Sequence, residues 1–410
     1  MLDPKLIREK PKDIKLVLKK RGLDVKLVDT WVKADKEFRD LKVKLDQLRH
    51  QRNVVSEAIN KLNKAGKKKE AQEKIKEAKK IAEQTRKSEE LMQKIEPKLN
   101  TLTLSFPNSV DKKCPDKEKI ISKSGTPKKQ KFQKDYLTLC KKLRIIDFES
   151  ATNMSGEGFY LLKKDGATLL RALINLCLDT AKKDNYTEIQ LPILLNEQAV
   201  TFSGHLPKFE EGMYKTREGL YLSPTEEVGL LNLYSKQNIS LDKLPIHLTA
   251  YIPSFRTEKG ATKGMFRVHQ FDEVELFKVV HPKDSEKELK KMVETAVKPL
   301  KLLGLPYRIK LLPAWDLSTQ NSITYDVEVF SPVSGWLEVS SCSNSLDFQA
   351  RRARIHFVDG GKRDFVHTLN GTCLGLNRTF IALIENYQQK EGSIKIPTAL
   401  QKYFGKKIIK

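Results

Sequence analysis

The sequence lacks the features that mark several large classes of protein. Its five cysteines are dispersed over 410 residues and form no CxxC pair. Such dispersal argues against a disulfide framework or a zinc site and indicates a reducing compartment. No apolar run approaches the roughly 18 residues that a membrane-spanning helix needs. The sequence therefore predicts a cytoplasmic protein that holds no zinc and has no membrane partner.

Common nucleotide-binding and targeting motifs are missing as well. There is neither a GxGxxG nor a GxxxxGK[ST] pattern, so a Rossmann or P-loop site is not supported. The opening residues, MLDPKLIREKPKD, carry acids early and no apolar segment, so no secretory signal or transit peptide is evident. With 39% hydrophobic residues, the chain still has material for two or three domains and a substantial core.

Positive charge is abundant and unevenly placed. The formal net charge is +24, and residues 1–140 hold 38 Lys and Arg against 21 Asp and Glu, an excess of 17. The remaining residues hold 38 against 31, an excess of 7. Lysine and arginine bind polyanions by neutralising phosphates and releasing counterions, so the first third favours a nucleic-acid partner. A solvated, lysine-rich surface without a partner is the alternative.

The first third has the periodicity of a long helical hairpin. Apolar residues in steps of three and four predict a coiled-coil helix over 31–63, with Arg52 as the single polar interruption; they are Phe38, Leu41, Leu45, Leu48, Val55, Ile59 and Leu62. Gly66 marks a turn, and a weaker return pattern uses Ile75, Ala78, Ala82, Met92 and Leu99. We expect a domain over 1–104 with a coiled coil over about 31–100. Its basic faces favour a nucleic-acid-binding arm, and a dimerisation coiled coil is the alternative.

A proline-rich, charged segment separates this arm from an ordinary globular sequence. Residues 105–131 break every periodicity, which predicts a linker. Beyond it, a helical pattern over 167–183 lies among short β-rich segments such as YTEIQLPILL and WLEVSSCSN. Short strands between turns predict an antiparallel sheet with flanking helices, and hence an α+β domain over 132–410.

One stretch of this domain, FRTEKGATKGMFRVHQFDEVELF at 255–277, carries unusual charge for a β-hairpin. Arg256 and Glu258 are two residues apart, so on one strand they would share a face. An arginine suits a phosphate, and a glutamate can accept a hydrogen bond from an exocyclic amine. Arg267, Phe271 and Glu275 on the return strand would add an aromatic platform and two charges. A solvent-facing salt-bridge ladder is the alternative, and it explains only two of these residues.

Two further segments supply groups that a nucleotide enzyme needs. Glu338 and Ser341 lie three apart in GWLEVSSCSN, and their oxygens suit Mg²⁺ on phosphates. In LNGTCLGLNRT, Arg378 begins a helix after Gly371 and Gly375, where it could hold a terminal phosphate.

Together these segments closely resemble those of the seryl-tRNA synthetases, which are class II aminoacyl-tRNA synthetases. The resemblance rests on FRTE, GMFRVHQFDEVELF, LSPTEEV, EVSSCSNSLDFQARR and LNGTCLGLNRT, and extends to MLDPKLIREKP, LRHQRNVVSEAI, GHLPKFEEGMYK and ALQKYF. It covers nearly the whole chain. It implies a homodimeric class II catalytic domain, a basic arm that grips serine tRNA, and ATP-dependent activation of L-serine followed by its transfer to tRNA(Ser). The resemblance leaves open whether tRNA(Sec) is charged too.

The resemblance also implies a role for individual residues. Arg256, Glu338 and Arg378 would be the catalytic residues. The predicted ATP site consists of Arg256, Glu258, Arg267, Phe271, Glu338, Ser341 and Arg378. The predicted serine site consists of Thr225, Glu227, Arg256, Glu275 and Thr372. Glu338 and Ser341 would hold Mg²⁺ on the phosphates, and Pro192 would lie at the dimer interface.

Some positions depart from the family pattern. The turn between Glu258 and Arg267 is about four residues shorter than usual, Asn377 replaces a glycine, and His205 replaces a glutamine. The short turn leaves two alternatives: a synthetase-like paralogue that loads a carrier other than tRNA, or a paralogue that binds nucleic acid without catalysis.

Overall fold

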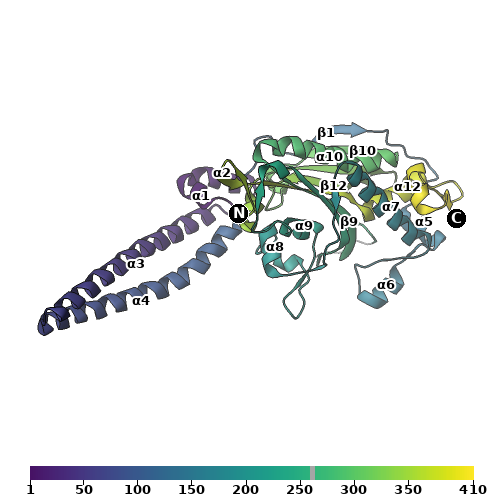
Figure 1. The fold of residues 1–410 in the computed structure, drawn as a ribbon. Coiled ribbons are helices and arrows are strands. Elements are labelled where there is room, and N and C mark those ends of the chain that lie inside the picture. The colour runs from purple at the N-terminus through teal and green to yellow at the C-terminus, as the bar shows by residue number, and fades with distance from the viewer. Residues whose placement is uncertain (259–263) are drawn as a thin grey trace. The chain divides into compact units, whose positions relative to one another are not determined.

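The computed structural model describes residues 1–258 and 264–410, which divide into two compact units (Figure 1). The smaller unit, Leu2–Phe106, is entirely helical. It contains α1 (Pro4–Glu9), α2 (Pro11–Lys20), α3 (Lys26–Lys64) and α4 (Lys68–Ser105). α3 and α4 run side by side as an antiparallel hairpin, which confirms the predicted arm. The turn between them places Gly66 at a φ of +74°, a conformation that glycine adopts without steric cost.

The seam between α3 and α4 combines branched aliphatic side chains with small and polar ones. Leu48 and Val55 of α3 pack against Ile81 of α4 in one buried cluster. On α4 the buried positions also include Ala71, Thr85 and Ser88, at heptad spacing from Ile81. Ile75 and Ala82, which the sequence pattern placed in the seam, are exposed. The predicted register of α4 was therefore wrong at these two positions. The seam runs through Thr85 and Ser88, and a search for apolar residues does not find these polar side chains.

The base of the arm has a small core of its own. Trp31 packs edge to face on Phe106 at 6.4 Å, within a cluster that includes Ile7 and Leu18. The indole Nε1 of Trp31 donates to the Thr103 hydroxyl at 2.7 Å, so its one polar atom is satisfied. This core fixes α1 and α2 to the paired ends of α3 and α4.

The larger unit, which spans Pro107–Lys410, is built on an eight-stranded sheet. Every neighbouring pair is antiparallel except β4 with β8. In spatial order the strands are β1 (Lys119–Ser124), β10 (Tyr307–Leu311), β11 (Ile323–Ser331), β12 (Gly335–Asn344), β15 (His367–Gly375), β9 (Gln270–Val280), β8 (Ile246–Phe255) and β4 (Thr187–Glu188). This architecture confirms the predicted α+β fold.

The two faces of the sheet bury different chemistry. α7 (Asp165–Lys183), α10 (Ser285–Leu302) and α12 (Leu376–Tyr387) pack on one face, where they meet Val274 and Leu276 of β9. Successive side chains of a strand point to opposite faces, so Glu273 and Glu275 point away from these helices. α9 (Glu226–Asn232) packs against β8 and β9 on that second face, and the functional side chains gather there.

Smaller elements complete the unit. The helices are α5 (Tyr136–Leu143), α6 (Phe148–Ser155), α8 (Glu197–Ser203), α11 (Phe348–Ala353) and α13 (Thr398–Phe404). The short strands are β2 (Ile146–Asp147) with β3 (Leu161–Leu162), β5 (Leu194–Leu195) with β6 (Tyr221–Leu222), β7 (Asn238–Ser240) with β13 (His356–Asp359) and β14 (Lys362–Phe365), and β16 (Ile394–Lys395) with β17 (Ile408–Ile409). None of the helices in residues 1–258 and 264–410 is long and apolar enough to cross a membrane.

The segment predicted as a linker contains ordered structure. Its residues from Pro107 onward belong to the larger unit. Asn108 anchors the start of this stretch, because its Nδ2 donates to the carbonyls of Gln320 at 2.9 Å and Ser345 at 2.7 Å. Further along, β1 is the edge strand of the sheet and carries Lys119 and Lys123. Charged edge strands resist pairing with other chains, which explains why this strand looks like a linker in the sequence.

The seam of the arm can be tested by a matched pair of substitutions. We expect Ile81→Ala to lower the free energy of unfolding of the arm by about 2 kcal/mol, because it leaves a cavity between the helices. Ile75→Ala removes the same atoms from a side chain that is 39% exposed, so its effect should lie within about 0.5 kcal/mol. Thermal unfolding followed by helical circular dichroism measures both. Equal effects of the two substitutions would contradict the observed register.

Candidate active site

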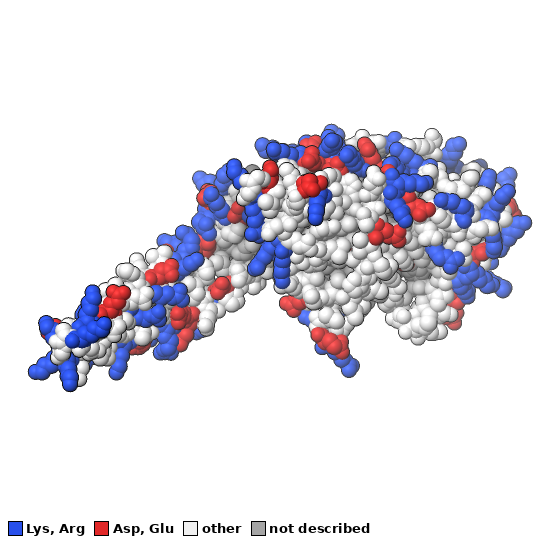
Figure 2. Space-filling model, viewed as in Figure 1, with Lys and Arg blue, Asp and Glu red and all other residues white. Residues whose placement is uncertain are grey.

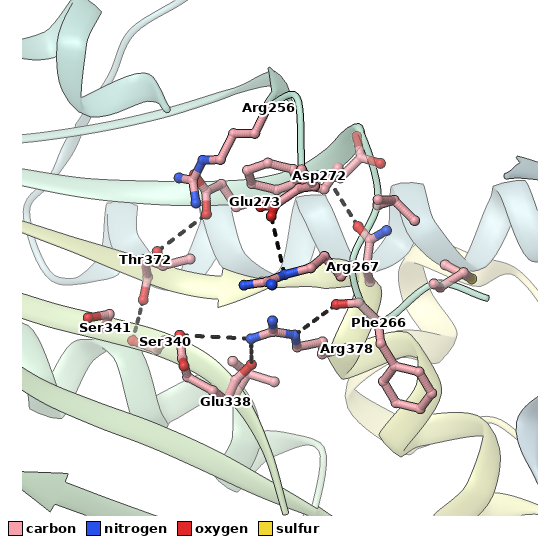
Figure 3. Close-up of a pocket in the computed structure, with 17 residues that line it drawn as sticks. Arg256, Phe266, Arg267, Asp272, Glu273, Glu338, Ser340, Ser341, Thr372 and Arg378 are labelled. Atoms are coloured by element: carbon pink, nitrogen blue, oxygen red, sulfur yellow. Dashed lines mark hydrogen bonds and ion pairs between the residues drawn. The ribbon is translucent and has the colours of Figure 1, made fainter. Parts of the chain in front are cut away.

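Two adjoining cavities lie on the second face of the sheet, and the predicted site residues line them. The first has a volume of about 260 Å³ and the second about 520 Å³. They share a wall of five residues: Arg256, Glu273, Glu338, Ser341 and Thr372. Figure 3 shows the first cavity, with these five side chains and Arg378 converging from several strands and a helix.

The first cavity brings together the residues predicted to bind ATP. Besides those of the shared wall, it contains Glu258, Arg267, Phe271 and Arg378. They come from the segment that follows β8, the segment that precedes β9, β9 itself and the first turn of α12. Positions distant in the sequence thus meet because β12, β15, β9 and β8 are neighbours in the sheet.

The hairpin strands are shorter than the sequence predicted. β8 ends at Phe255 and β9 begins at Gln270, so Arg256, Glu258 and Arg267 lie beyond the strands rather than on them. One further backbone hydrogen bond, from the Arg256 N–H to the His269 carbonyl at 3.0 Å, continues the pairing. The side chains still line one cavity, although strand alternation does not position them. Residues 259–263 of the short turn lie outside the described residues.

The arginines of the first cavity are held by specific contacts. The Arg256 Nε donates to the Pro224 carbonyl at 3.1 Å, and its guanidinium lies 4.8 Å from the centre of the Phe271 ring. Arg267 and Glu258 form an ion pair at 3.2 Å. The two groups predicted to contact ATP therefore neutralise each other in the free protein.

Arg378 is fixed by backbone carbonyls. Its Nε donates to the Phe266 carbonyl at 3.2 Å and its Nη1 to the Glu338 carbonyl at 2.9 Å, while the Glu338 carboxylate lies 3.8 Å away (Figure 3). A guanidinium has five N–H donors, and these two bonds orient the group while leaving donors for an anion. The arrangement suits recognition of a phosphate.

The second cavity collects the residues predicted to bind serine. Thr225, Glu227 and Glu275 line it together with Arg256 and Thr372 of the shared wall. Thr225 is the N-cap of α9, since its hydroxyl accepts from the Glu227 N–H at 3.3 Å. The cap places Glu227 in the first turn of the helix, where it is buried.

Buried carboxylates dominate the second cavity. Burial raises the pKa of Glu275 well above its usual range, and the neighbouring Glu273 adds to the shift. Burial also raises the pKa of Glu227 to about 7, although Gln349 and Asn370 both donate to its carboxylate. A buried carboxylate ionises more readily when a positive charge lies beside it, so these carboxylates favour the binding of a cation. The site therefore suits an ammonium group.

Several residues of the site escaped the sequence analysis. Glu273 lines both cavities, and Asn370 lines the second. Each lies two residues before a predicted serine contact, Glu275 and Thr372 respectively, and so on the same face of its strand. Period-two spacing could have found both residues. Gln349 lies on α11, and no local pattern indicated it.

The two substituted positions, His205 and Asn377, have different settings. His205 lines the second cavity, where burial lowers its pKa to about 3 and so keeps the ring neutral. Asn377 lines the first cavity and accepts from the Asp272 N–H at 3.1 Å through Oδ1. The nearby His269 bonds to the Tyr214 hydroxyl at 2.9 Å and stacks on Phe159, which indicates a structural role.

The predicted metal ligands fit a divalent cation that also binds phosphates. Glu338 and Ser341 both lie in the shared wall. Asp326 of β11 is paired with Ser341 across the sheet, and its buried Oδ1 has no hydrogen-bond partner. Among the described residues, no group of three or more His, Cys, Asp or Glu side chains could hold a metal by itself. Magnesium is commonly bound by one or two carboxylates together with substrate phosphates, and this donor set matches that pattern.

Two family models match the sequence. Residues 1–110 match the seryl-tRNA synthetase N-terminal domain. Residues 208–387 match the class II tRNA synthetase core domain of the enzymes for G, H, P, S and T. The first model covers the helical arm, and the second covers both cavities except for Gly204 and His205.

Full-length relatives and solved structures agree with these models. Serine–tRNA ligases from Methanosarcina barkeri and Thermodesulfovibrio yellowstonii are 39% and 40% identical and cover 99% and 100% of this chain, with 97% and 100% of their own lengths matched. The ATP complex of Pyrococcus horikoshii seryl-tRNA synthetase superposes with a TM-score of 0.92 at 31% identity, covering 100% of this chain and 99% of that one. The AMP complex of a Naegleria fowleri cytoplasmic serine–tRNA ligase gives 0.87 at 28% identity, with the same coverage. This chain belongs to the seryl-tRNA synthetase family.

Proposed function

We propose that this enzyme uses ATP to convert L-serine into seryl-adenylate and then transfers the serine to tRNA(Ser). The observation that carries the proposal is the shared wall: a cavity rich in arginine and a cavity rich in carboxylates meet at Arg256 and Thr372. Such a pair of cavities can hold a nucleotide and an amino acid with their reacting ends together. The relatives named as serine–tRNA ligases support the same reaction.

The nucleotide would occupy the first cavity. Phe271 would stack on the adenine, and Glu258 would accept from its exocyclic amine. Binding would exchange the Glu258–Arg267 ion pair for contacts with ATP, which frees Arg267 for the phosphates. Arg378, already oriented by two carbonyls, would bind the γ-phosphate.

Serine would occupy the second cavity with its carboxylate at the shared wall. Its ammonium would lie among Thr225, Glu227, Glu275 and Thr372, where it relieves the cost of buried negative charge. Arg256 would then bind both the serine carboxylate and the α-phosphate. Hydrogen-bonding groups around the serine hydroxyl would reject alanine, because they would be left unpaired.

The first step is an in-line displacement. A serine carboxylate oxygen attacks the α-phosphorus, the bond to the bridging oxygen breaks, and pyrophosphate leaves. The terminal ribose hydroxyl of the tRNA then attacks the serine carbonyl, and AMP leaves. Neither cavity needs to supply a protein nucleophile, since Arg256 and Arg378 act by positioning and by neutralising charge. Mg²⁺ held by Glu338 and Ser341 would neutralise further phosphate charge.

The assembly and the tRNA contacts are part of the proposal. Lysines crowd the tip of the arm, where Lys67, Lys68 and Lys69 are all exposed (Figure 2). This tip and the flanks of α3 and α4 would bind the tRNA phosphates. Ile193 and Leu194, next to Pro192, expose 36% and 47% of their surface, which supports a homodimer interface at this position. We also infer a cytoplasmic location.

Charging of tRNA tests the overall reaction. We expect the enzyme to catalyse serine-dependent exchange of pyrophosphate into ATP and to charge a tRNA(Ser) transcript. Deleting the variable arm of the transcript should abolish charging and leave exchange intact, because activation needs no tRNA. Glu275→Ala should abolish exchange while the circular dichroism spectrum is retained. Exchange without charging of the intact transcript would contradict tRNA(Ser) as the acceptor and favour another carrier.

Arg378 provides a test of phosphate recognition. Because its charge would stabilise the displaced pyrophosphate, we expect Arg378→Ala to lower kcat for pyrophosphate exchange about 100-fold or more. Arg378→Lys keeps the charge but loses the oriented fork and should recover only part of the rate. Arg363→Ala, on the exposed strand β14, serves as the control with unchanged exchange. A normal rate for Arg378→Ala would remove Arg378 from the proposed site.

The raised pKa of Glu227 predicts that serine binding depends on pH. The carboxyl titrates near pH 7 in the free protein, and the serine ammonium favours its ionised form, so binding releases a proton. Serine affinity should therefore fall as the pH drops from 8 to 6, by up to about tenfold per unit below 7. Calorimetric titration should show a shallower slope for Glu227→Gln and the original slope for the exposed Glu218→Gln. Equal slopes in all three proteins would contradict the assignment.

A further inference from the structure

Asp326 occupies a position that the proposed function does not use. It lies on β11 directly opposite Ser341 of β12, so the two Cβ atoms are about 5 Å apart on one face of the sheet. Glu338 is three residues from Ser341 on the same strand, beyond a bulge that separates Ser340 from Glu338 in the pairing. Asp326 thus borders the two residues proposed to hold magnesium.

The carboxylate of Asp326 is buried without full compensation. The residue is only 6% exposed, and Oδ1 has no hydrogen-bond partner. An unpaired carboxylate oxygen in such surroundings is strongly unfavourable unless a cation or a proton joins it. Glu385 offers a contrast, because its buried carboxylate accepts from Ser331, Val333 and Ser334.

The lysine opposite Asp326 forms its ion pairs with other carboxylates. Lys310 of β10 lies opposite Asp326 on the other side. Its ammonium is engaged by Glu118 at 2.8 Å and by Glu328 at 2.9 Å. Glu328, two residues further along β11, also binds Arg308. Glu328, the cross-strand partner of Glu338, is therefore satisfied by protein cations. Asp326 instead lies opposite Ser341, with the negative charge of Glu338 nearby.

We propose that Asp326 is a third protein oxygen ligand, beside Glu338 and Ser341, for the divalent cation bound with ATP. This inference rests on the proposed function, because the cation comes with the nucleotide. Two carboxylates and one hydroxyl leave the remaining coordination positions to phosphate oxygens and water, as is usual for magnesium. The cation would supply the charge that the buried Oδ1 lacks.

Manganese binding measured by electron paramagnetic resonance tests this inference without relying on activity. The intact protein is saturated with an ATP analogue that has a methylene group between the α- and β-phosphorus, and Mn²⁺ is titrated in. We expect Asp326→Asn, which keeps the shape but removes the charge, to weaken Mn²⁺ about tenfold or more. Asp316→Asn, which removes an exposed negative charge nearby, is the matched control and should bind as the wild type does.

Two more variants separate the possible failures. Asp326→Glu retains the carboxylate and should keep more of the Mn²⁺ affinity than Asp326→Asn; equal losses would mean that position 326 acts only through packing, which overturns the inference. If Glu338→Gln weakens Mn²⁺ and Asp326→Asn does not, the inference fails and the proposed metal site stands. If neither weakens it, the metal site of the proposed function fails as well.

Discussion

The burial of several carboxylates on one face of a single sheet is the constraint on which the rest of the larger unit depends. Glu226, Glu227, Glu273 and Glu275 are each less than 10% exposed. Ionised carboxylates lose their hydration when buried, so every one needs donors or a cation. The backbone N–H of Ile252 and the hydroxyl of Ser254 serve Glu226, and two side-chain amides serve Glu227. The opposite face carries the apolar core that α7, α10 and α12 complete. The free energy gained by burying this apolar surface offsets the cost of burying the carboxylates.

The free protein keeps its cavity ready for a nucleotide by pairing groups with one another. Glu258 neutralises Arg267, Phe271 supports Arg256, and two carbonyls aim Arg378. Groups oriented before the substrate arrives need little rearrangement when charge develops, which is how such sites lower reaction barriers. Asn377 takes part in this order by accepting from the backbone N–H of Asp272.

Much of this structure could be predicted from the sequence, and the exceptions have physical causes. The hairpin and the sheet were predicted correctly, because coiled-coil periodicity and strand alternation are local properties. The resemblance to the seryl-tRNA synthetases indicated eleven site residues, and the structure brings all of them to the walls of the two cavities. The seam of α4 was placed wrongly at Ile75 and Ala82, because Thr85 and Ser88 are polar in sequence yet buried in the structure. Contacts between residues far apart in the chain decide the remaining features, which local sequence patterns do not predict. These features are the ends of β8 and β9, the strand within the linker and the amide of Gln349.

The wall shared by the two cavities has a thermodynamic consequence. Arg256, Glu273 and Thr372 border both volumes, so whatever fills one cavity changes the electrostatic surroundings of the other. Coupling between two ligands is reciprocal: if ATP alters the affinity for serine by some factor, serine alters the affinity for ATP by the same factor. A phosphate and an ammonium on either side of one arginine and one glutamate attract each other through that wall. The two substrates are thereby made to act as effectors of each other, and no separate regulatory site is needed for the enzyme to favour the state in which both are bound.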